Sequence, residues 1–355
     1  MTYFQKLAII LLFLCNWATL SHAATKDGTS LKVGAIIATT GTKVSGFIEI
    51  EAGNDQTTRI PVTIFNGQRT GPTISLIGGT HGYEYAPIIA LQNVAQQIDP
   101  MSLSGNIIIV HVANMPSFLG RTIYYSPVDK KNLNRAYPGD EQGSITERIT
   151  HAITTEIIEQ SDYLVDMHSG DGNEALRPYI YMPHTGNQDL DTTIKEMALS
   201  FGIDHIIIDR TPVTAPESST FTDMTALSRG IPAMTTEIGG AGSTDAHWVD
   251  KNIKGINNLL RHLKILPGEV QTFSPPVWLE DYTVVTSPDT GIFKPEVRDG
   301  YMVAKGSTLG HLVDFFGTPI AEITAPFAGV INYVIITPPV TKGEPLAMLS
   351  HIKVE

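Results

Sequence analysis

The sequence predicts an α/β protein that ends in a small all-β domain. Between about residues 73 and 266, short apolar strands alternate with helix-like stretches. Such alternation predicts βαβ units and a mixed, mainly parallel sheet flanked by helices. After Pro267-Gly268 and Ser274-Pro275-Pro276 the pattern changes, and only short strands and turns follow. We therefore expect one domain over residues 24–270 and a second over residues 271–355.

The individual elements follow from local patterns in chain order. Residues 31–65 read as N-terminal strands, because they alternate in part between apolar and polar residues and are punctuated by glycines. Ser144 precedes Glu147 by three residues, a capping box that opens a helix. After residue 65, the expected elements are a strand at 73–77, a helix at about 84–98, a strand at 106–112, a helix at about 144–160, a strand at 163–167, a helix at 190–201, strands at 205–208 and 233–237, and a long helix at 244–266.

The first residues predict an exported protein. Lys6 supplies a positive start, residues 7–14 form an unbroken apolar run, and Ser21 and Ala23 are small residues at the positions that signal peptidase reads. The apolar run is too short for a membrane anchor, which needs roughly 20 apolar residues. We expect residues 1–23 to be a cleaved signal peptide, and the mature protein to be secreted, or periplasmic in a Gram-negative host, with no membrane attachment.

Composition excludes several functional classes. The chain has 355 residues and a formal net charge of −12, without a lysine- and arginine-rich cluster, so it is a poor candidate for nucleic-acid binding. Its single cysteine, Cys15, allows no internal disulfide, no cysteine-based zinc finger and no iron–sulfur cluster. A metal site in this protein would therefore use His, Asp and Glu.

Candidate metal ligands follow three separate predicted strands. His81 and Glu84 lie in the turn after the strand at 73–77, His168 follows the strand at 163–167, and Glu237 ends the strand at 233–237. Taken singly, each is more often a surface histidine, a helix-start carboxylate or a turn residue. Ligands of open α/β sheets, however, gather at the carboxyl ends of strands. The shared placement therefore indicates a functional site.

Four stretches carry a resemblance to a known family. They are Gly78-Gly-Thr-His-Gly-Tyr-Glu84, Asn132-Leu-Asn-Arg-Ala-Tyr-Pro-Gly139, Asp166-Met-His-Ser169 and Thr236-Glu-Ile-Gly-Gly240. In this order, and over about two-thirds of the chain, they resemble the succinylglutamate desuccinylase/aspartoacylase family, which is related to the zinc carboxypeptidases. The resemblance implies a zinc-carboxypeptidase-like fold.

The resemblance also assigns roles to individual residues. It implies one Zn²⁺ per chain, bound by His81, Glu84 and His168, with Glu237 as the catalytic carboxylate. It implies substrate and oxyanion contacts from Asn134 and Arg135, and Arg121 matches the family's upstream catalytic arginine. The guanidinium of Arg135 suits a substrate carboxylate, which a lysine could not bind in the same bidentate way. A carboxylate such as Glu237 can take a proton from water and pass it to a leaving amine.

Two residues depart from the family pattern. Tyr83 stands where many relatives have an acidic residue, which leaves the ligand spacing intact. Asn132 stands where several relatives have Asp, and in contact with a zinc-bound histidine a neutral amide would lower the basicity of that ligand. Asp166, two residues before His168, either supplies the missing acid or faces away as an ordinary strand residue. Four tyrosines could line a pocket, with packing in the core or at the rim as the default expectation, namely Tyr124, Tyr125, Tyr179 and Tyr181.

The carboxyl-terminal segment resembles the biotinyl/lipoyl-like, barrel-sandwich domain that closes proteins of this family. A carrier function would need a lysine at the hairpin tip before Ala325-Pro326, and the sequence there is Thr318-Pro-Ile-Ala-Glu-Ile323. We therefore expect a structural role, either narrowing the mouth of the active site or supporting a homo-oligomer.

The function indicated is a zinc-dependent amidohydrolase that removes the acyl group from a small anionic N-acyl amino acid or a similar small acylated amine. An exported zinc carboxypeptidase acting on peptides or cell-wall fragments is the first alternative. A non-catalytic binding protein is the second, and the intact set of His81, Glu84, His168 and Glu237 argues against it.

Overall fold

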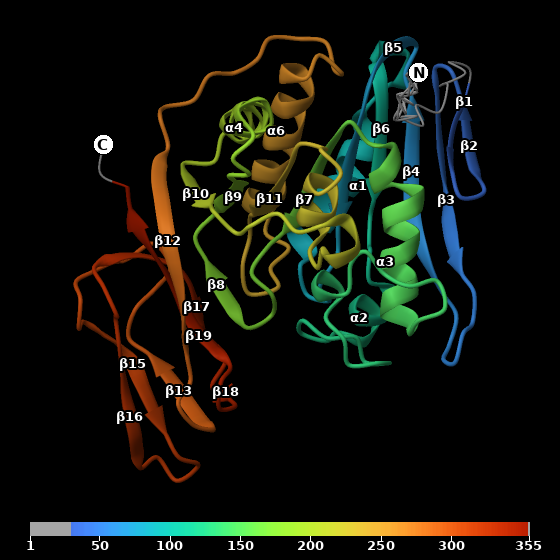
Figure 1. Cartoon of the computed structure of the whole chain (residues 1–355). Coiled ribbons are helices and arrows are strands. Elements are labelled where there is room, and N and C mark those ends of the chain that lie inside the picture. The colour runs from blue at the N-terminus through green and yellow to red at the C-terminus, as the bar shows by residue number, and fades with distance from the viewer. Residues whose placement is uncertain (1–29, 354–355) are drawn as a thin grey trace, which may run out of the picture.

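The structure is a computed structural model that describes residues 30–353 (Figure 1). The predicted signal peptide at residues 1–23, including Cys15, lies outside this range. Within residues 30–353, no helix is both long and apolar enough to cross a bilayer.

A large mixed sheet forms the centre of the molecule. Its strands lie in the order β14-β17-β19-β12-β10-β9-β11-β7-β5-β6-β4-β3, and β8 pairs with β17 off this path. Their bounds are β3 Thr42–Ile50, β4 Thr58–Asn66, β5 Arg69–Gly78, β6 Ser104–Val110, β7 Tyr163–His168, β8 Glu174–Leu176, β9 Tyr179–Pro183, β10 His205–Asp209, β11 Ala233–Glu237, β12 Val277–Thr286, β14 Met302–Val303, β17 Gly329–Ile335 and β19 Pro345–Ile352.

Parallel pairing is concentrated in the middle of this sheet. β5 runs parallel to β6 and β7, and β7 runs parallel to β11. β9, β10 and β12 are also parallel to one another, but β9 is antiparallel to β11. The central strands are continuous apolar runs, such as Ile107–Val110, which is wholly buried, as expected for strands covered on both faces. The predicted mixed α/β fold is confirmed, with antiparallel strands at both ends of the sheet.

Helices cover both faces of the sheet. α1 (Tyr85–Gln97) and α4 (Gln188–Phe201) pack against α6 (Ala246–His262), whereas α3 (Ile145–Glu156) packs against β3, and α5 (Thr222–Leu227) against β7 and β11. The four longer helices lie where the sequence predicts them, to within a few residues. The capping box is present, since the backbone N–H of Ser144 donates to Glu147 Oε2 at 2.9 Å. Two short helices, α2 (Met115–Gly120) and α5, were not predicted.

The segment from β12 onward contains only strands and turns, as predicted. A four-stranded sheet in the order β16-β15-β13-β18 has its own apolar core, which includes Phe293, Leu309 and Leu312. Its strands are β13 Gly291–Pro295, β15 Thr308–Val313, β16 Pro319–Thr324 and β18 Pro339–Val340. β12, β17 and β19 instead extend the large sheet. The division of the chain at residue 270 stays a prediction. A separate pair, β1 (Ser30–Val33) and β2 (Ile36–Thr39), lies at the other end of the chain.

Candidate active site

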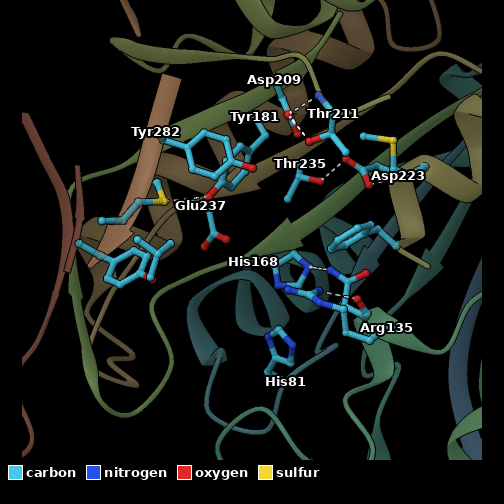
Figure 2. Close-up of a pocket in the computed structure, with 16 residues that line it drawn as sticks. His81, Arg135, His168, Tyr181, Asp209, Thr211, Asp223, Thr235, Glu237 and Tyr282 are labelled. Carbon is cyan, nitrogen blue, oxygen red and sulfur yellow. Dashed lines mark hydrogen bonds between the residues drawn. The ribbon is translucent and has the colours of Figure 1, made fainter. Parts of the chain in front are cut away.

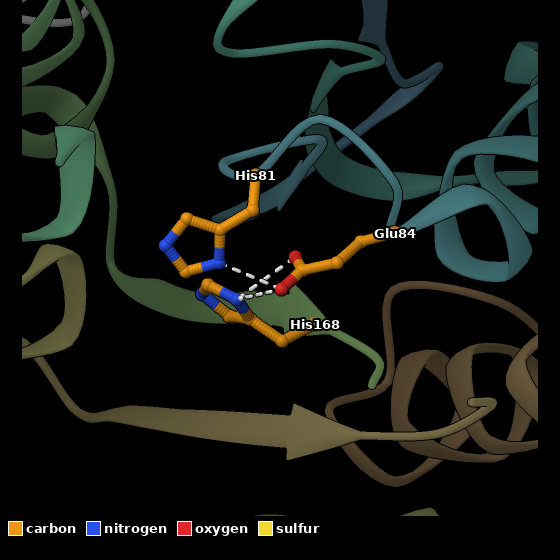
Figure 3. A group of neighbouring side chains, drawn as sticks. All are labelled: His81, Glu84 and His168. Atoms are coloured by element: carbon orange, nitrogen blue, oxygen red, sulfur yellow. Dashed lines mark hydrogen bonds and ion pairs between the residues drawn. The ribbon is translucent and has the colours of Figure 1, made fainter. Parts of the chain in front are cut away.

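Three side chains converge beyond the ends of two neighbouring parallel strands (Figure 3). β5 ends at Gly78, and the turn that follows carries His81 and then Glu84, which caps α1. β7 ends at His168 itself. One ligand atom from each of the three side chains lies within 4.8 Å of the other two. The predicted His–Glu–His set is therefore brought together, with Glu84 and His168 buried and His81 partly buried.

The two imidazoles present the same nitrogen to Glu84. His81 Nδ1 lies 2.7 Å from Glu84 Oε1, and His168 Nδ1 lies 3.0 Å from Glu84 Oε2. The other ring nitrogen of each histidine is also hydrogen-bonded. His81 Nε2 lies 3.1 Å from Asn132 Oδ1, and His168 Nε2 lies 2.9 Å from Asp166 Oδ2. Hydrogen bonds of this kind orient metal-binding histidines in proteins. Asp166 thus faces the site, which settles the alternative that the sequence left open.

This arrangement fits a divalent metal ion. Bonds of about 2.0–2.2 Å to nitrogen and oxygen put neighbouring ligand atoms of a tetrahedral site roughly 3.3 Å apart, close to the separations around Glu84. Glu84 Oε2 is buried and takes part in no hydrogen bond of acceptable geometry with the described residues, although it lies near His168. A cation between the two Nδ1 atoms and the carboxylate would supply the missing partner.

Electrostatics favour the charged form of the carboxylate. Burial alone would raise the pKa of Glu84, but His168 and His81 outweigh burial and lower that pKa to about 2. Burial would likewise lower the pKa of His168, and Asp166 and Glu84 raise it instead. Glu84 is therefore ionised near neutral pH, which is the form of a carboxylate that binds a metal cation.

Glu237 lies beside this cluster. It is the last residue of β11, and its register partner on β7 is His168. Burial raises the pKa of Glu237 well above its ordinary value, and His168 opposes this while Glu84 adds to it. A raised pKa makes a carboxylate a stronger base, which suits a general acid–base group.

Two adjoining cavities meet at the cluster. The inner cavity has a volume of about 290 Å³ and runs along the sheet past Thr235 and Tyr181 (Figure 2). The outer cavity measures about 470 Å³ and reaches Glu84 and Tyr124. The residues that line both are His81, Arg135, Tyr181, Glu237 and Tyr333.

Of the three arginine and asparagine side chains predicted to act on the substrate, two line the cavities and one does not. Arg135 lines both cavities, and its guanidinium lies 4.4 Å from the centre of the Phe221 ring. Asn134 lines the inner cavity, where its amide oxygen accepts hydrogen bonds from the N–H and hydroxyl of Thr222. Arg121 is exposed at the end of α2 and lines neither cavity. The structure thus brings Arg135 and Asn134 to the site and leaves Arg121 outside it.

Several cavity residues were not predicted. The four tyrosines line the cavities, the alternative to packing in the core or at the rim, and the rings of Tyr124 and His81 are T-shaped to each other with centroids 5.8 Å apart. The strand alternation gives a usable signal for Tyr179 and Tyr181, which share a sheet face with Glu237. The other unpredicted lining residues of the inner cavity are Asp209, Thr211, Phe221, Asp223, Met224, Thr235, Tyr282, Val284, Tyr333 and Met348.

The outer cavity also holds an unpredicted carboxyl group. Glu174, at the start of β8, accepts a hydrogen bond from the hydroxyl of Tyr124 at 2.6 Å. Burial raises the pKa of Glu174 to about 7, which the bond from Tyr124 partly offsets. No sequence pattern marks this residue, because β8 is brought to the site by its pairing with β17.

The mixed sheet, the ligand cluster at its strand ends and the neighbouring carboxyl and guanidinium groups are those of a hydrolase. Residues 70–263 match the model of the succinylglutamate desuccinylase/aspartoacylase catalytic domain, and the chain belongs to that family.

Individual relatives agree with this assignment. The chain is 29% identical over 318 residues to the N-alpha-acetyl-L-2,4-diaminobutyric acid deacetylase of Halomonas elongata, a match that covers 86% of this chain and 91% of that protein. The product-bound ectoine utilization protein EutE (DoeB) from Ruegeria pomeroyi superposes with a TM-score of 0.79 and 28% identity, over 87% and 95% of the two chains. A succinylglutamate desuccinylase/aspartoacylase from Rhodobacter sphaeroides gives a TM-score of 0.78 and 26% identity, over 88% and 96%.

Proposed function

We propose that the protein is a zinc-dependent deacylase that hydrolyses the amide bond of an N-acyl amino acid. The observation that carries the proposal is the convergence of His81 Nδ1 and His168 Nδ1 on the Glu84 carboxylate, in a cavity that also contains Glu237 and Arg135. The deacetylase relative from Halomonas elongata supports the reaction class and suggests an N-acetylated amino acid as the first substrate to test.

His81, Glu84 and His168 would hold the zinc ion. When bound, Zn²⁺ supplies a Lewis acid that polarises a carbonyl oxygen and acidifies water. Asn132 and Asp166 orient the two imidazoles, so that their Nδ1 atoms stay turned toward Glu84.

Glu237 would move the proton. Hydrolysis forms a bond between a water oxygen and the acyl carbon and breaks the amide C–N bond. Glu237 takes a proton from the water and returns it to the departing nitrogen, so that a carboxylate and an amine leave. Burial raises the pKa of Glu237, which makes its carboxylate a stronger base toward water.

Arg135 would bind the substrate carboxylate. Its guanidinium lies over the Phe221 ring and donates through Nη1 to the carbonyl oxygen of Asn134, which limits its orientations, and its remaining N–H groups can donate to a carboxylate. The inner cavity, about 290 Å³, lies at the small end of the range for ligand pockets, roughly 300–1,000 Å³, and favours a small substrate over a peptide.

The test combines metal analysis with an amine-release screen. Purified protein should bind one zinc ion per chain and release amine from N-acyl amino acids, while Glu237→Gln should retain zinc and lose about 10²- to 10⁴-fold in kcat. Failure to bind zinc after reconstitution contradicts the metal assignment, and equal turnover by Glu237→Gln contradicts the proton-transfer role. Hydrolysis of peptides but not of acyl amino acids would favour the carboxypeptidase alternative.

We also propose that the mature protein is exported. The support is the sequence pattern of residues 1–23. Intact-mass analysis of the protein from its native host should give a chain that begins near residue 24, and a retained Met1 would contradict export by this route.

A further inference from the structure

Two carboxylates, Asp209 and Asp223, line the inner cavity on the side away from His81 (Figure 2). Asp209 ends β10, which runs parallel to β9 and therefore opposite to β11. The carboxyl end of β10 therefore points in the opposite direction from the carboxyl end of β11, where Glu237 lies. Thr235 and Tyr181 lie between these two ends on the same sheet face. The cavity consequently has acidic groups at both of its ends.

The hydrogen bonds of these two carboxylates leave one oxygen without a donor. Asp209 Oδ1 accepts from the N–H and the hydroxyl of Thr211, at 2.9 and 2.7 Å, whereas Oδ2 accepts from none of the described residues. Asp223 accepts from the N–H of Met224 at 2.7 Å and from the Thr235 hydroxyl at 3.0 Å. The side chains are only 9% and 7% exposed, so what little exposure they have is to the cavity that they line.

Neither carboxylate has a lysine or arginine ion-pair partner among the described residues, although Arg135 lines the same cavity and interacts with the charge of Asp223 at longer range. Within residues 30–353, no lysine or arginine nitrogen lies within 4 Å of either carboxylate, and Arg135 instead donates to the carbonyl oxygen of Asn134 and stacks on Phe221. Burial raises the pKa of Asp223 to about 6, and Asp166 adds to the rise. Burying carboxylates without a partner costs free energy, which a cationic ligand group would offset.

We propose that Asp209 and Asp223 form a subsite for a cationic amine, and that the substrates are N-acyl diamino acids. The proposal rests on the deacylase function proposed above and specifies the side chain of its substrate. Arg135 then binds the carboxylate, the amide lies between Glu237 and His81, and the side-chain ammonium donates to Asp209 Oδ2 and Asp223. Ammonium groups recognised by carboxylates form charge-assisted hydrogen bonds, which are about twice as strong as neutral ones.

The kinetic test compares two nearly isosteric substrates, Nα-acetyl-2,4-diaminobutyrate, which ends in an ammonium, and Nα-acetylnorvaline, which ends in a methyl. The zinc-loaded wild type should prefer the cationic substrate about tenfold or more in kcat/KM. Asp209→Asn and Asp223→Asn should remove most of this preference, mainly by raising KM for the cationic substrate. The matched control is Asp250→Asn, at an exposed position on α6, which should keep the preference.

A binding measurement separates this proposal from the deacylase function. Calorimetric titration with 2,4-diaminobutyrate and with norvaline needs no turnover, so it reports on the cation subsite even in a protein that hydrolyses no acyl amino acid. Wild type should bind the diamino acid about tenfold more tightly, and each Asn variant should lose that difference. Equal binding of the two amino acids, binding of neither, or an unchanged difference in a folded Asp209→Asn variant would overturn the subsite. Thermal melting shows whether each variant folds. If Asp223→Asn does not fold, the binding difference is measured with Asp209→Asn alone.

Discussion

The two sides of the cavity are built in different ways. The side that carries the ligand cluster comes from short sequence stretches at the ends of β5, β7 and β11, which are neighbours in the sheet. The opposite wall comes from Tyr282, Tyr333 and Met348, on strands β12, β17 and β19 near the end of the chain. Each residue that would carry the chemistry therefore lies in a short stretch at a strand end, whereas the opposite wall comes from strands near the end of the chain that carry no such stretch.

The largest effect should come from removing a ligand on the first side. His168→Ala deletes one of the three proposed zinc ligands, removes the imidazole partner of Asp166, and leaves Glu84 with His81 as its one remaining histidine partner. We expect zinc content to fall to background and amine release to become undetectable, measured by elemental analysis and the amine assay. Tyr333→Phe is the matched control on the opposite wall and should keep its zinc. Retention of one zinc per chain by His168→Ala would break the assignment of this side.

A smaller effect on zinc affinity should come from Asp166, which is hydrogen-bonded to the ligand His168. Asp166→Asn keeps the size of the side chain but weakens its hydrogen bond to His168 Nε2. Loss of such a partner typically costs 10- to 100-fold in metal affinity. Competition with a chromophoric chelator measures this change, and Asp250→Asn serves as the control. Zinc affinity equal to that of wild type would mean that Asp166 does not tune the site.

The opposite wall should affect substrate binding but not the metal. Tyr333→Ala removes an aromatic ring that lines both cavities, so KM for a small N-acyl amino acid should rise about tenfold while zinc content and kcat change little. Steady-state kinetics beside Tyr333→Phe separate loss of the ring from loss of the hydroxyl. A fall in zinc content with Tyr333→Ala would show that the two sides are not independent.

The smallest effect concerns stability away from both sides. Burial lowers the pKa of His111 to about 4, from an ordinary value near 6.5. Its neutral ring is therefore favoured in the folded protein, and the unfolded chain binds the extra proton first as pH falls. The free energy of unfolding should drop between pH 6.5 and 4, on the order of 1–3 kcal/mol from this group. Urea unfolding of wild type and His111→Gln checks this, because the variant should lose less stability over that range.

Sequence patterns predicted site residues correctly where these residues follow directly from the end of a predicted strand. The His81, His168 and Glu237 positions followed from strand ends, and β5, β7 and β11 turned out to be neighbours in the sheet. Asp209 also follows a strand, but its location depended on the direction of β10, which is set by the antiparallel pairing of β9 with β11. Asp223 lies in α5, a six-residue helix with no clear periodicity. Strand direction and short helices depend on tertiary packing, so local sequence could not predict these two residues.

The β8–β17 pairing has a practical consequence for anyone who shortens this protein. Cutting the chain at residue 270 would remove β17, which pairs with β8, and β12, one of the two neighbours of β10. The apolar strand His205–Asp209 would then become an open edge of the sheet, and open edges promote aggregation. A recombinant fragment limited to the segment that matches the family's catalytic domain should therefore be recovered in insoluble form, although it contains every proposed zinc ligand.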